Sequence, residues 1–542
     1  MMKIWIFLEN VSFNMSSNKI QVTYNQYIII FSILNAILFS KPFFSYLWLL
    51  RKNILIELGF YTFAFFVSNV VFSILFTKKT LKPASLAIIF INSIALYFMN
   101  KYNIQIDVSM VINIFETNFG EAKDLLSLQL FLYIFLFGFI PIVSILKYVQ
   151  VDYRNNSLLK RLKFFLVNLT FSLIIAYSST KIDRVYKFLR NENRFTVNYY
   201  LPVNYIGNIV AAIVLKIYNS IPQKVIELDV QQKIKHNKRN NIIVFILGES
   251  ARSQNFSLNG YGRNTNEPLE SYDMISFRNV YSCAVSTTMS IPCIFSHLGR
   301  SEFDKAKAKN YENLLDIFSK IGYNVKWLSN NGGCKDVCNR IKYSSVSGLS
   351  KNRYDDSLTK GLIREIKHIK NRNNFLVLNQ IGSHHTYHKR YPETFDVFKP
   401  SCKKPMSDCK YEELVNTYDN TILYTSKNIK DIIDILMANF KESNIFVIYV
   451  SDHGDGLGES RIFAHGMPYS EATDYVKKVP LLLWFSDNFV DEFKIDKKCL
   501  TNKINDNLSH DNIFHSMLGL FDIENEYYDE NLDIFRSCRY GQ

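Results

Sequence analysis

Acidic and imidazole side chains follow two strongly apolar runs in the second half of this 542-residue chain. Glu249 comes shortly after residues 242–247, and Asp452 and His453 come shortly after residues 445–450. Continuous apolar runs of this length are typical of buried parallel strands, and the ligands of open α/β sheets gather beyond the carboxyl ends of such strands. We therefore expect these three side chains to meet in space. Carboxylates combined with an imidazole are typical zinc ligands, so the pattern predicts a metalloenzyme.

A third apolar run, residues 375–378, leads into the pair His384-His385. A polar residue after a single strand is common in turns and indicates nothing about function by itself. Because three strands end in the same way, a shared site is the better interpretation.

The segment 283–293 offers the best candidate for a nucleophile, since it carries Thr287 and Thr288 between two cysteines. A threonine hydroxyl is a weak nucleophile at neutral pH, but coordination to Zn²⁺ would lower its pKa. A helix start is also a favourable place for developing negative charge. The alternative interpretation is that both threonines are ordinary helix-capping residues.

Long apolar segments fill residues 1–180, whereas the remainder of the chain has the mixed composition of a soluble domain. A membrane helix needs about 20 apolar residues, and a cleaved signal peptide would explain only one such segment. We therefore predict an amino-terminal transmembrane domain of five helices, at about residues 24–40, 54–77, 81–99, 126–147 and 161–180.

The connections between these segments differ in charge. Lysine and arginine follow the second and fourth segments, whereas the connection after the third segment is acidic. Positively charged connections stay in the cytoplasm. The amino terminus is thus predicted to lie inside and the large carboxyl-terminal domain outside.

Residues 181–240 are predicted to connect the membrane domain, residues 1–180, to a catalytic domain at 241–542. Within this connector, residues 203–218 are apolar but shorter than a span, so we expect an amphipathic helix in the membrane interface. A sixth membrane span is the alternative, and it would place the catalytic domain in the cytoplasm.

All eight cysteines lie beyond residue 280, and an even number in an exported domain indicates a disulfide framework in an oxidising compartment such as the periplasm. A zinc site at Cys334 and Cys338 is the rival interpretation, but no second cysteine or histidine pair stands at the usual distance. Three close pairs are evident and two cysteines are left over: Cys283/Cys293, Cys334/Cys338 and Cys402/Cys409, with Cys499 and Cys538.

The formal net charge of +14 favours contact with anionic lipid head groups. Nucleic acid is the other usual partner of a basic protein, but the chain contains no base-stacking or groove-reading motif. We therefore expect a membrane partner and no nucleic acid.

Four motifs together resemble those of the periplasmic phosphoethanolamine transferases that modify lipid A, in the alkaline phosphatase/sulfatase superfamily. The resemblance extends over nearly the whole chain. It implies a five-helix anchor in the bacterial inner membrane, followed by a periplasmic sulfatase-like α/β/α domain. The motifs are Gly248-Glu249-Ser250-Ala251-Arg252, Cys-x3-Thr-x5-Cys at 283–293, Ser451-Asp452-His453-Gly454 and His465-Gly466-Met467-Pro468.

The resemblance also implies a role for each residue of the predicted metal site. The catalytic zinc ion would be held by Glu249, Thr287, Asp452 and His453. Whether a second zinc ion also binds is left open. Thr287, four residues after Cys283, would be the nucleophile that carries the phosphoethanolamine.

Further residues match positions that contact the substrate in this family. His384 and His465 would lie beside the phosphate or around a second metal, and one of them would protonate the leaving group. Lys335 would face a phosphate oxygen. The membrane-proximal residues implied to approach the ethanolamine head group are Asn113, Thr117 and Glu121.

The chain departs from the family pattern in two places. The family usually continues after the histidine with Gly-Pro, whereas this chain has His385-Thr386, so His385 is an alternative to His384. A serine of some family members is replaced by Gly332, and one contact to the head group would be lost.

The expected reaction is zinc-dependent transfer of phosphoethanolamine from phosphatidylethanolamine to a lipid A phosphate, through a phosphothreonine intermediate. Such a product would carry less negative charge and bind cationic peptides such as polymyxin less well.

The alternatives are transfer to a core sugar, protein or glycan, or a phosphoglycerol transferase of the lipoteichoic acid synthase type. A sulfatase lacks support because its Cys/Ser-x-Pro-x-Arg motif is absent. A non-catalytic sensor is disfavoured because every ligand position is filled. We expect a monomer.

Overall fold

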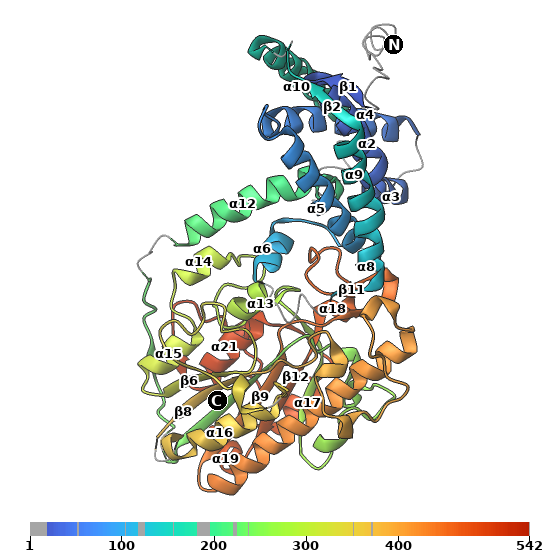
Figure 1. The fold of residues 1–542 in the computed structure, drawn as a ribbon. Helices are drawn as coiled ribbons and strands as arrows, with labels where there is room; N and C mark the ends of the chain where they lie inside the picture. The colour runs from blue at the N-terminus through green and yellow to red at the C-terminus, as the bar shows by residue number, and fades with distance from the viewer. Residues whose placement is uncertain are drawn as a thin grey trace. The chain divides into compact units, whose positions relative to one another are not determined.

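A computed structural model describes this chain except residues 1–18, 51–53, 103, 117–124, 155–156, 182–195, 221–224, 237, 351, 370–371 and 541–542. The chain folds into two compact units, Met1–Tyr218 and Asn219–Gln542 (Figure 1). The predicted connector contains the boundary between these units, and its own limits stay a prediction.

The first unit consists mainly of helices, and all five predicted membrane segments are helical. Other helices of this unit are α3 (Lys41–Leu50), α6 (Val108–Glu116) and α12 (Val203–Ser220), and β1 (Ile20–Thr23) pairs in parallel with β2 (Val149–Asp152). The predicted segments correspond to α2 (Tyr24–Phe39), α4 (Ile54–Leu75), α5 (Leu81–Tyr102), the continuous run of α8 (Leu128–Tyr133), η2 (Ile134–Phe139) and α9 (Ile140–Tyr148), and α10 (Leu158–Lys181).

Two of the described helices are long and apolar enough to cross a membrane, judged by length and composition: α5 and the run Leu128–Tyr148. The count of five membrane spans therefore stays a prediction. Large apolar side chains are nevertheless exposed along the run Leu128–Tyr148 and along α10, as expected of helices that face lipid instead of water. They include Leu128, Phe131, Phe135, Leu136, Phe139, Leu159, Phe171 and Ile174.

The second unit is built around an eight-stranded sheet with the order β13-β5-β12-β9-β4-β8-β6-β7. The three apolar runs of the sequence are β4, β8 and β9, and the predicted parallel strands are confirmed because β4 lies between the other two. The central parallel strands are β9 (Asn444–Ser451), β4 (Asn241–Gly248), β8 (Asn374–Asn379), β6 (Asn324–Ser329) and β7 (Lys342–Ser345). On the other side of β9, β12 (Lys478–Phe485) runs antiparallel to β9 and to β5 (Ile275–Tyr281), which pairs in parallel with β13 (Asn507–Ser509).

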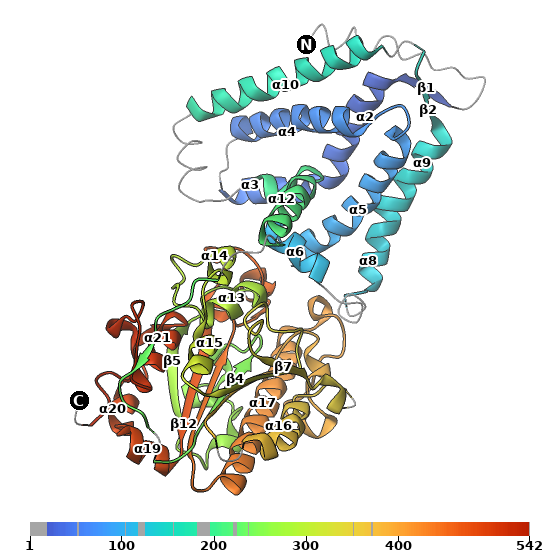
Figure 2. The same cartoon turned by 90° about the vertical axis from the view of Figure 1, so that its left-hand side faces the viewer.

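Helices cover both faces of this sheet (Figure 2). Alternate side chains of β4 enter two separate cores, with Phe245 on one face and Val244 on the other, and every residue of the strand is buried. This two-sided burial explains why the strand is continuously apolar in sequence. One core is closed by α13 (Thr287–Ile294), α15 (Leu314–Lys320), α19 (Asp487–Phe493) and α21 (Asp511–Leu520), and the other by α16 (Asp356–Ile369) and α17 (Tyr411–Asn439).

All eight cysteines form disulfides, so the predicted framework is confirmed. The zinc site considered for the second pair is wrong, because both of its sulfurs are in a disulfide. The bonds are Cys283–Cys293, Cys334–Cys338, Cys402–Cys409 and Cys499–Cys538.

Candidate active site and metal centre

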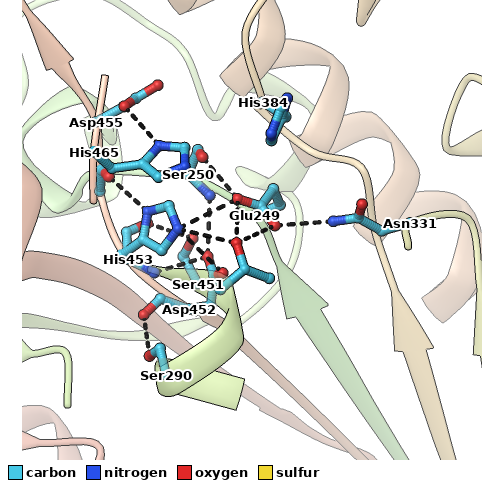
Figure 3. Close-up of polar contacts among 12 residues, drawn as sticks. Glu249, Ser250, Ser290, Asn331, His384, Ser451, Asp452, His453, Asp455 and His465 are labelled. Atoms are coloured by element: carbon cyan, nitrogen blue, oxygen red, sulfur yellow. Dashed lines mark hydrogen bonds and ion pairs between the residues drawn. The ribbon is translucent and has the colours of Figure 1, made fainter. Parts of the chain in front are cut away.

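Glu249, Asp452 and His453 meet at the carboxyl edge of the sheet, as the strand pattern predicts (Figure 3). The register of β4 and β9 pairs Gly248 with Ser451, so the next residues of the two strands emerge side by side. The Nε2 atom of His453 lies 3.4 Å from Oε1 of Glu249 and 3.3 Å from Oδ2 of Asp452. All three side chains are buried.

Thr287 begins α13 and brings its hydroxyl into the same cluster. Its Oγ1 lies 3.2 Å from Oε2 of Glu249 and 3.3 Å from Nε2 of His453. The helix is fixed in this position by the disulfide that joins its Cys293 to Cys283, and by the hydroxyl of Ser290, which donates a hydrogen bond of 2.5 Å to the carbonyl oxygen of Asp452.

His453 is held in the form that binds metals. Its Nδ1–H donates to the carbonyl oxygen of Gly454 at 2.8 Å, which fixes the tautomer and leaves the Nε2 lone pair facing Thr287. Burial, and after it the charge of His465, lowers the pKa of His453 to about 4. The ring is therefore neutral at physiological pH.

Asp452 supplies the clearest test of whether this cluster suits a metal ion. Its Oδ1 accepts the backbone N–H groups of Ser250 and His453, whereas its buried Oδ2 has no hydrogen-bond partner among the described residues. Burial, together with the charge of Glu249, raises the pKa of Asp452 well above its usual range. A divalent cation between the two carboxylates would reverse that shift. With the hydroxyl of Thr287, the cluster offers two carboxylates, an imidazole nitrogen and an alcohol, a set that fits Zn²⁺.

His465 lies against the cluster and is oriented by Asp455, a residue not predicted from the sequence. The Nδ1–H of His465 donates to Oδ1 of Asp455 at 3.1 Å, and the other carboxylate oxygen accepts from the hydroxyl of Tyr387 at 2.7 Å. Burial would raise the pKa of Asp455, but His465 and these hydrogen bonds hold it below its usual range. Ligand atoms of Glu249, His453 and His465 lie within 4.8 Å of one another.

His384 and His385 both flank His465, with ring centroids 5.9 Å and 6.3 Å from it. The Nδ1–H of His384 donates to the carbonyl oxygen of His385 at 2.6 Å, and Arg390 donates to the carbonyl oxygens of both residues. Burial, and then the charges of His385 and Arg390, lower the pKa of His384. Burial and His465 lower the pKa of His385 to about 4. The geometry thus brings both alternatives to the site.

The other predicted substrate-binding residues belong to separate parts of the chain. Lys335 is half-buried in the loop that the Cys334–Cys338 disulfide closes, after β6. Asn113 lies on α6 in the first unit. Thr117 and Glu121 lie outside the described residues.

Two further residues fix the cluster and were not predicted from the sequence. Asn331 donates from Nδ2 to Oε2 of Glu249 at 2.9 Å; its position just after β6, a fourth strand ending at this edge, was the available indication. His510 accepts the backbone N–H of Cys283 at Nδ1 (3.1 Å) and donates from Nε2 to the carbonyl oxygen of Ser451 (3.0 Å). Nothing in the sequence around His510 indicated that role.

Comparison with known proteins places this geometry in a family. Residues 241–523 match the family model described as Sulfatase, and residues 64–217 match the model described as Phosphoethanolamine transferase EptA/EptB. The chain is 34% identical over 501 residues to phosphoethanolamine transferase EptA of Escherichia coli O157:H7, covering 90% of this chain and 91% of that protein. The chain belongs to the lipid A phosphoethanolamine transferase family of the alkaline phosphatase/sulfatase superfamily.

Solved structures of this transferase family match both units. The integral membrane protein lipooligosaccharide phosphoethanolamine transferase A (EptA) from Neisseria meningitidis has a TM-score of 0.87 and 31% identity, covering 96% of this chain and 99% of that chain. The soluble domain of the Neisseria meningitidis enzyme, solved alone, has a TM-score of 0.56 and 36% identity, and covers 59% and 99%. This phosphoethanolamine transferase is therefore an enzyme with a membrane domain followed by a sulfatase-like α/β domain.

Proposed function

We propose that this enzyme transfers phosphoethanolamine from phosphatidylethanolamine to a phosphate of lipid A, with Thr287 as the nucleophile. The observation that carries the proposal is the position of the Thr287 hydroxyl, 3.2 Å from a carboxylate oxygen of Glu249 and 3.3 Å from the bare Nε2 of His453. The names of the relatives, which include lipooligosaccharide as an acceptor, support the transferred group and the class of acceptor.

A zinc ion would be held by Glu249, Thr287, Asp452 and His453. When bound, it would lower the pKa of the threonine hydroxyl and offset charge on the phosphate oxygens. We leave a second zinc ion beside His384 and His465 as an open alternative.

The reaction divides into two displacements in which each proton has a source and a destination. In the first, Oγ1 of Thr287 gives its proton to His465 or His384 and bonds to the phosphorus of the donor, the bond from phosphorus to the diacylglycerol oxygen breaks, and the same histidine passes the proton to that oxygen. In the second, a phosphate oxygen of the acceptor bonds to the same phosphorus. The bond to Oγ1 breaks, and Oγ1 takes up the proton that the acceptor phosphate loses as it bonds.

Positive groups around the site are a physical requirement of this scheme. The phosphodiester brings a negative charge to a place that already holds the carboxylates of Glu249 and Asp452. Lys335 would contact a phosphate oxygen. The Asp455–His465 pair would present Nε2 of an imidazole whose Nδ1 is held by a hydrogen bond to Asp455.

The two units suggest how the enzyme reaches lipid substrates. We propose that residues 1–180 span the inner membrane five times, and that residues 181–240 connect them to a periplasmic catalytic domain at 241–542. Helix α12 would lie in the membrane interface, since large apolar side chains are exposed along it. Asn113, with Thr117 and Glu121, would contact the ethanolamine head group. We propose a monomer.

The proposal is tested by mass spectrometry of lipid A from cells that express the wild type, Thr287→Ala or Thr287→Ser. Thr287→Ala should lower phosphoethanolamine addition by at least about a thousandfold, because it removes the hydroxyl that would form the covalent intermediate. Thr287→Ser keeps a hydroxyl and should retain measurable addition. Equal addition by the wild type and Thr287→Ala would contradict the assigned nucleophile.

The same experiment separates the alternative acceptors. Phosphoethanolamine on a core sugar, protein or glycan, with lipid A unchanged, would contradict the lipid A assignment and keep the transferase. Transfer of glycerol phosphate in its place would favour the phosphoglycerol transferase alternative. Family membership makes that outcome the less expected one.

A further inference from the structure

Two cations share one aromatic ring near the nucleophile, and the proposed chemistry uses neither of them. The guanidinium carbon of Arg300 lies 4.5 Å from the centroid of the Tyr469 ring, and the Nζ atom of Lys477 lies 5.0 Å from the same centroid. Cations at such distances are attracted by the face of the ring. We refer to these three residues as the Tyr469 cluster.

The Tyr469 cluster is tied to the segment that carries the nucleophile. Tyr469 packs against the small apolar group that contains Val285, two residues before Thr287. The carbonyl oxygen of Lys477 accepts the backbone N–H of Ser282 at 2.8 Å. Lys477 also immediately precedes β12, whose antiparallel pairing with β9 puts that end of β12 at the catalytic edge of the sheet.

The two cations of the Tyr469 cluster have no carboxylate partner in an ion pair among the described residues. Two neighbouring acids are engaged otherwise: Asp511 accepts the backbone N–H of Arg300 at 3.0 Å, and Asp474 pairs with Lys478 at 3.3 Å. Burial lowers the pKa of Lys477, Asp474 opposes that shift, and the charge of Arg300 adds to it. An anion placed between the two cations would relieve their repulsion.

We propose that the Tyr469 cluster binds a second phosphate of the acceptor, next to the phosphate that receives phosphoethanolamine. This inference rests on the proposed function. An acceptor with two phosphates presents one of them to Thr287 and leaves the other without a partner. A guanidinium suits that group because its N–H donors match two phosphate oxygens at once. The cluster would therefore select acceptors that carry two phosphates over acceptors that carry one.

The test compares two acceptors with the full-length enzyme in vesicles of phosphatidylethanolamine and phosphatidylcholine, which contain no anionic phospholipid. The kcat/KM of transfer is measured for lipid A with two phosphates and for lipid A with one. The wild type should prefer the first acceptor. Arg300→Gln should reduce that preference about five- to tenfold, the effect of losing one charge-assisted hydrogen bond at a partly exposed site.

Further variants keep the inference falsifiable if Arg300→Gln folds poorly. Lys477→Gln should reduce the preference as well, and Arg300→Lys should fall between the wild type and Arg300→Gln. Lys430→Gln is the matched control, since it removes one positive charge from the exposed surface of α17, where Lys430 pairs with Asp434. It should keep the preference of the wild type.

The possible failures are distinguishable. Transfer by the wild type to neither acceptor contradicts the proposed function and this inference with it. Intact transfer with an unchanged preference in both Arg300→Gln and Lys477→Gln contradicts this inference alone. An equal loss with both acceptors also contradicts it, because the cluster would then bind a group that the two acceptors share.

Discussion

At the scale of the residue, burial and hydrogen bonds keep one side chain of the site neutral and its neighbour ionised. Burial keeps His453 neutral, with a pKa of about 4, so its Nε2 is available as a ligand. Asp455, two residues later and equally buried, has a lowered pKa because His465 and Tyr387 donate to it. In the proposed function, His453 would bind the metal and His465, oriented by Asp455, would transfer the proton.

Asp455→Asn tests that assignment with almost no change of volume. The amide can donate to Nδ1 of His465, which reverses the tautomer and puts the ring proton on the wrong nitrogen. We expect kcat to fall by about 10²–10⁴-fold with little change in the KM for the donor lipid. Steady-state kinetics of the purified full-length enzyme measure both constants.

Asp431→Asn is the control for loss of a carboxylate, because Asp431 pairs with Lys427 on the surface of α17. It should leave kcat unchanged. A wild-type kcat in Asp455→Asn would show that His465 needs no orientation by Asp455, and proton donation would then be assigned to His384.

At the scale of the element, α13 must be held against the end of β9, since Thr287 begins the helix and Asp452 follows the strand. His510, just before α21, joins the two through hydrogen bonds to the N–H of Cys283 and the carbonyl oxygen of Ser451. Because the ring is buried and neutral, with its pKa lowered by burial to about 3, one nitrogen accepts and the other donates.

Two substitutions separate these hydrogen bonds of His510. His510→Asn can still accept from Cys283, His510→Gln can still donate to Ser451, and His510→Ala can do neither. Each lost bond leaves a buried backbone group unpaired, at a cost of about 1–3 kcal/mol. We expect a moderate fall in kcat for His510→Asn and His510→Gln and a larger fall for His510→Ala. The KM for the donor lipid should stay nearly constant.

Thermal unfolding of the same variants distinguishes positioning from general stability. A role in positioning Thr287 predicts a fall in kcat at temperatures far below the unfolding transition. If all three variants keep the kcat of the wild type while their transition temperatures fall, His510 is a structural residue only.

Features that depend on neighbouring residues could be predicted from the sequence, whereas contacts between distant segments could not. The strand pattern placed Glu249, Asp452 and His453 correctly, because a buried parallel strand is readable from its apolar run and its next residue. The contact of His510 with Cys283 was not readable, since it depends on the meeting of segments more than 200 residues apart in sequence, whereas the position of Asn331 after β6 did offer an indication. The number of membrane spans was not settled either, because α2 is shorter than a bilayer crossing requires.

At the scale of the whole molecule, the catalytic unit has the features of an independent domain. Residues 219–542 contain the complete sheet, its two cores and all four disulfides, and the corresponding domain of a relative has been solved alone. The first unit supplies none of the proposed metal ligands. In the proposed function, the first unit anchors the enzyme in the membrane that contains the donor and acceptor lipids.

The second unit produced alone, residues 219–542, tests this division of labour. We expect a cooperative thermal unfolding transition and one equivalent of bound zinc by elemental analysis. We also expect transfer to membrane-embedded lipid A to fall by at least about a hundredfold, because the unit loses the high effective concentration that a membrane tether gives. Transfer from a short-chain, water-soluble phosphatidylethanolamine should persist.

If the folded, zinc-loaded unit fails with that donor too, the first unit contributes side chains to the reaction, and Asn113 becomes the first residue to substitute. If it modifies membrane lipid A as fast as the full chain, the anchor is not needed for access to substrate.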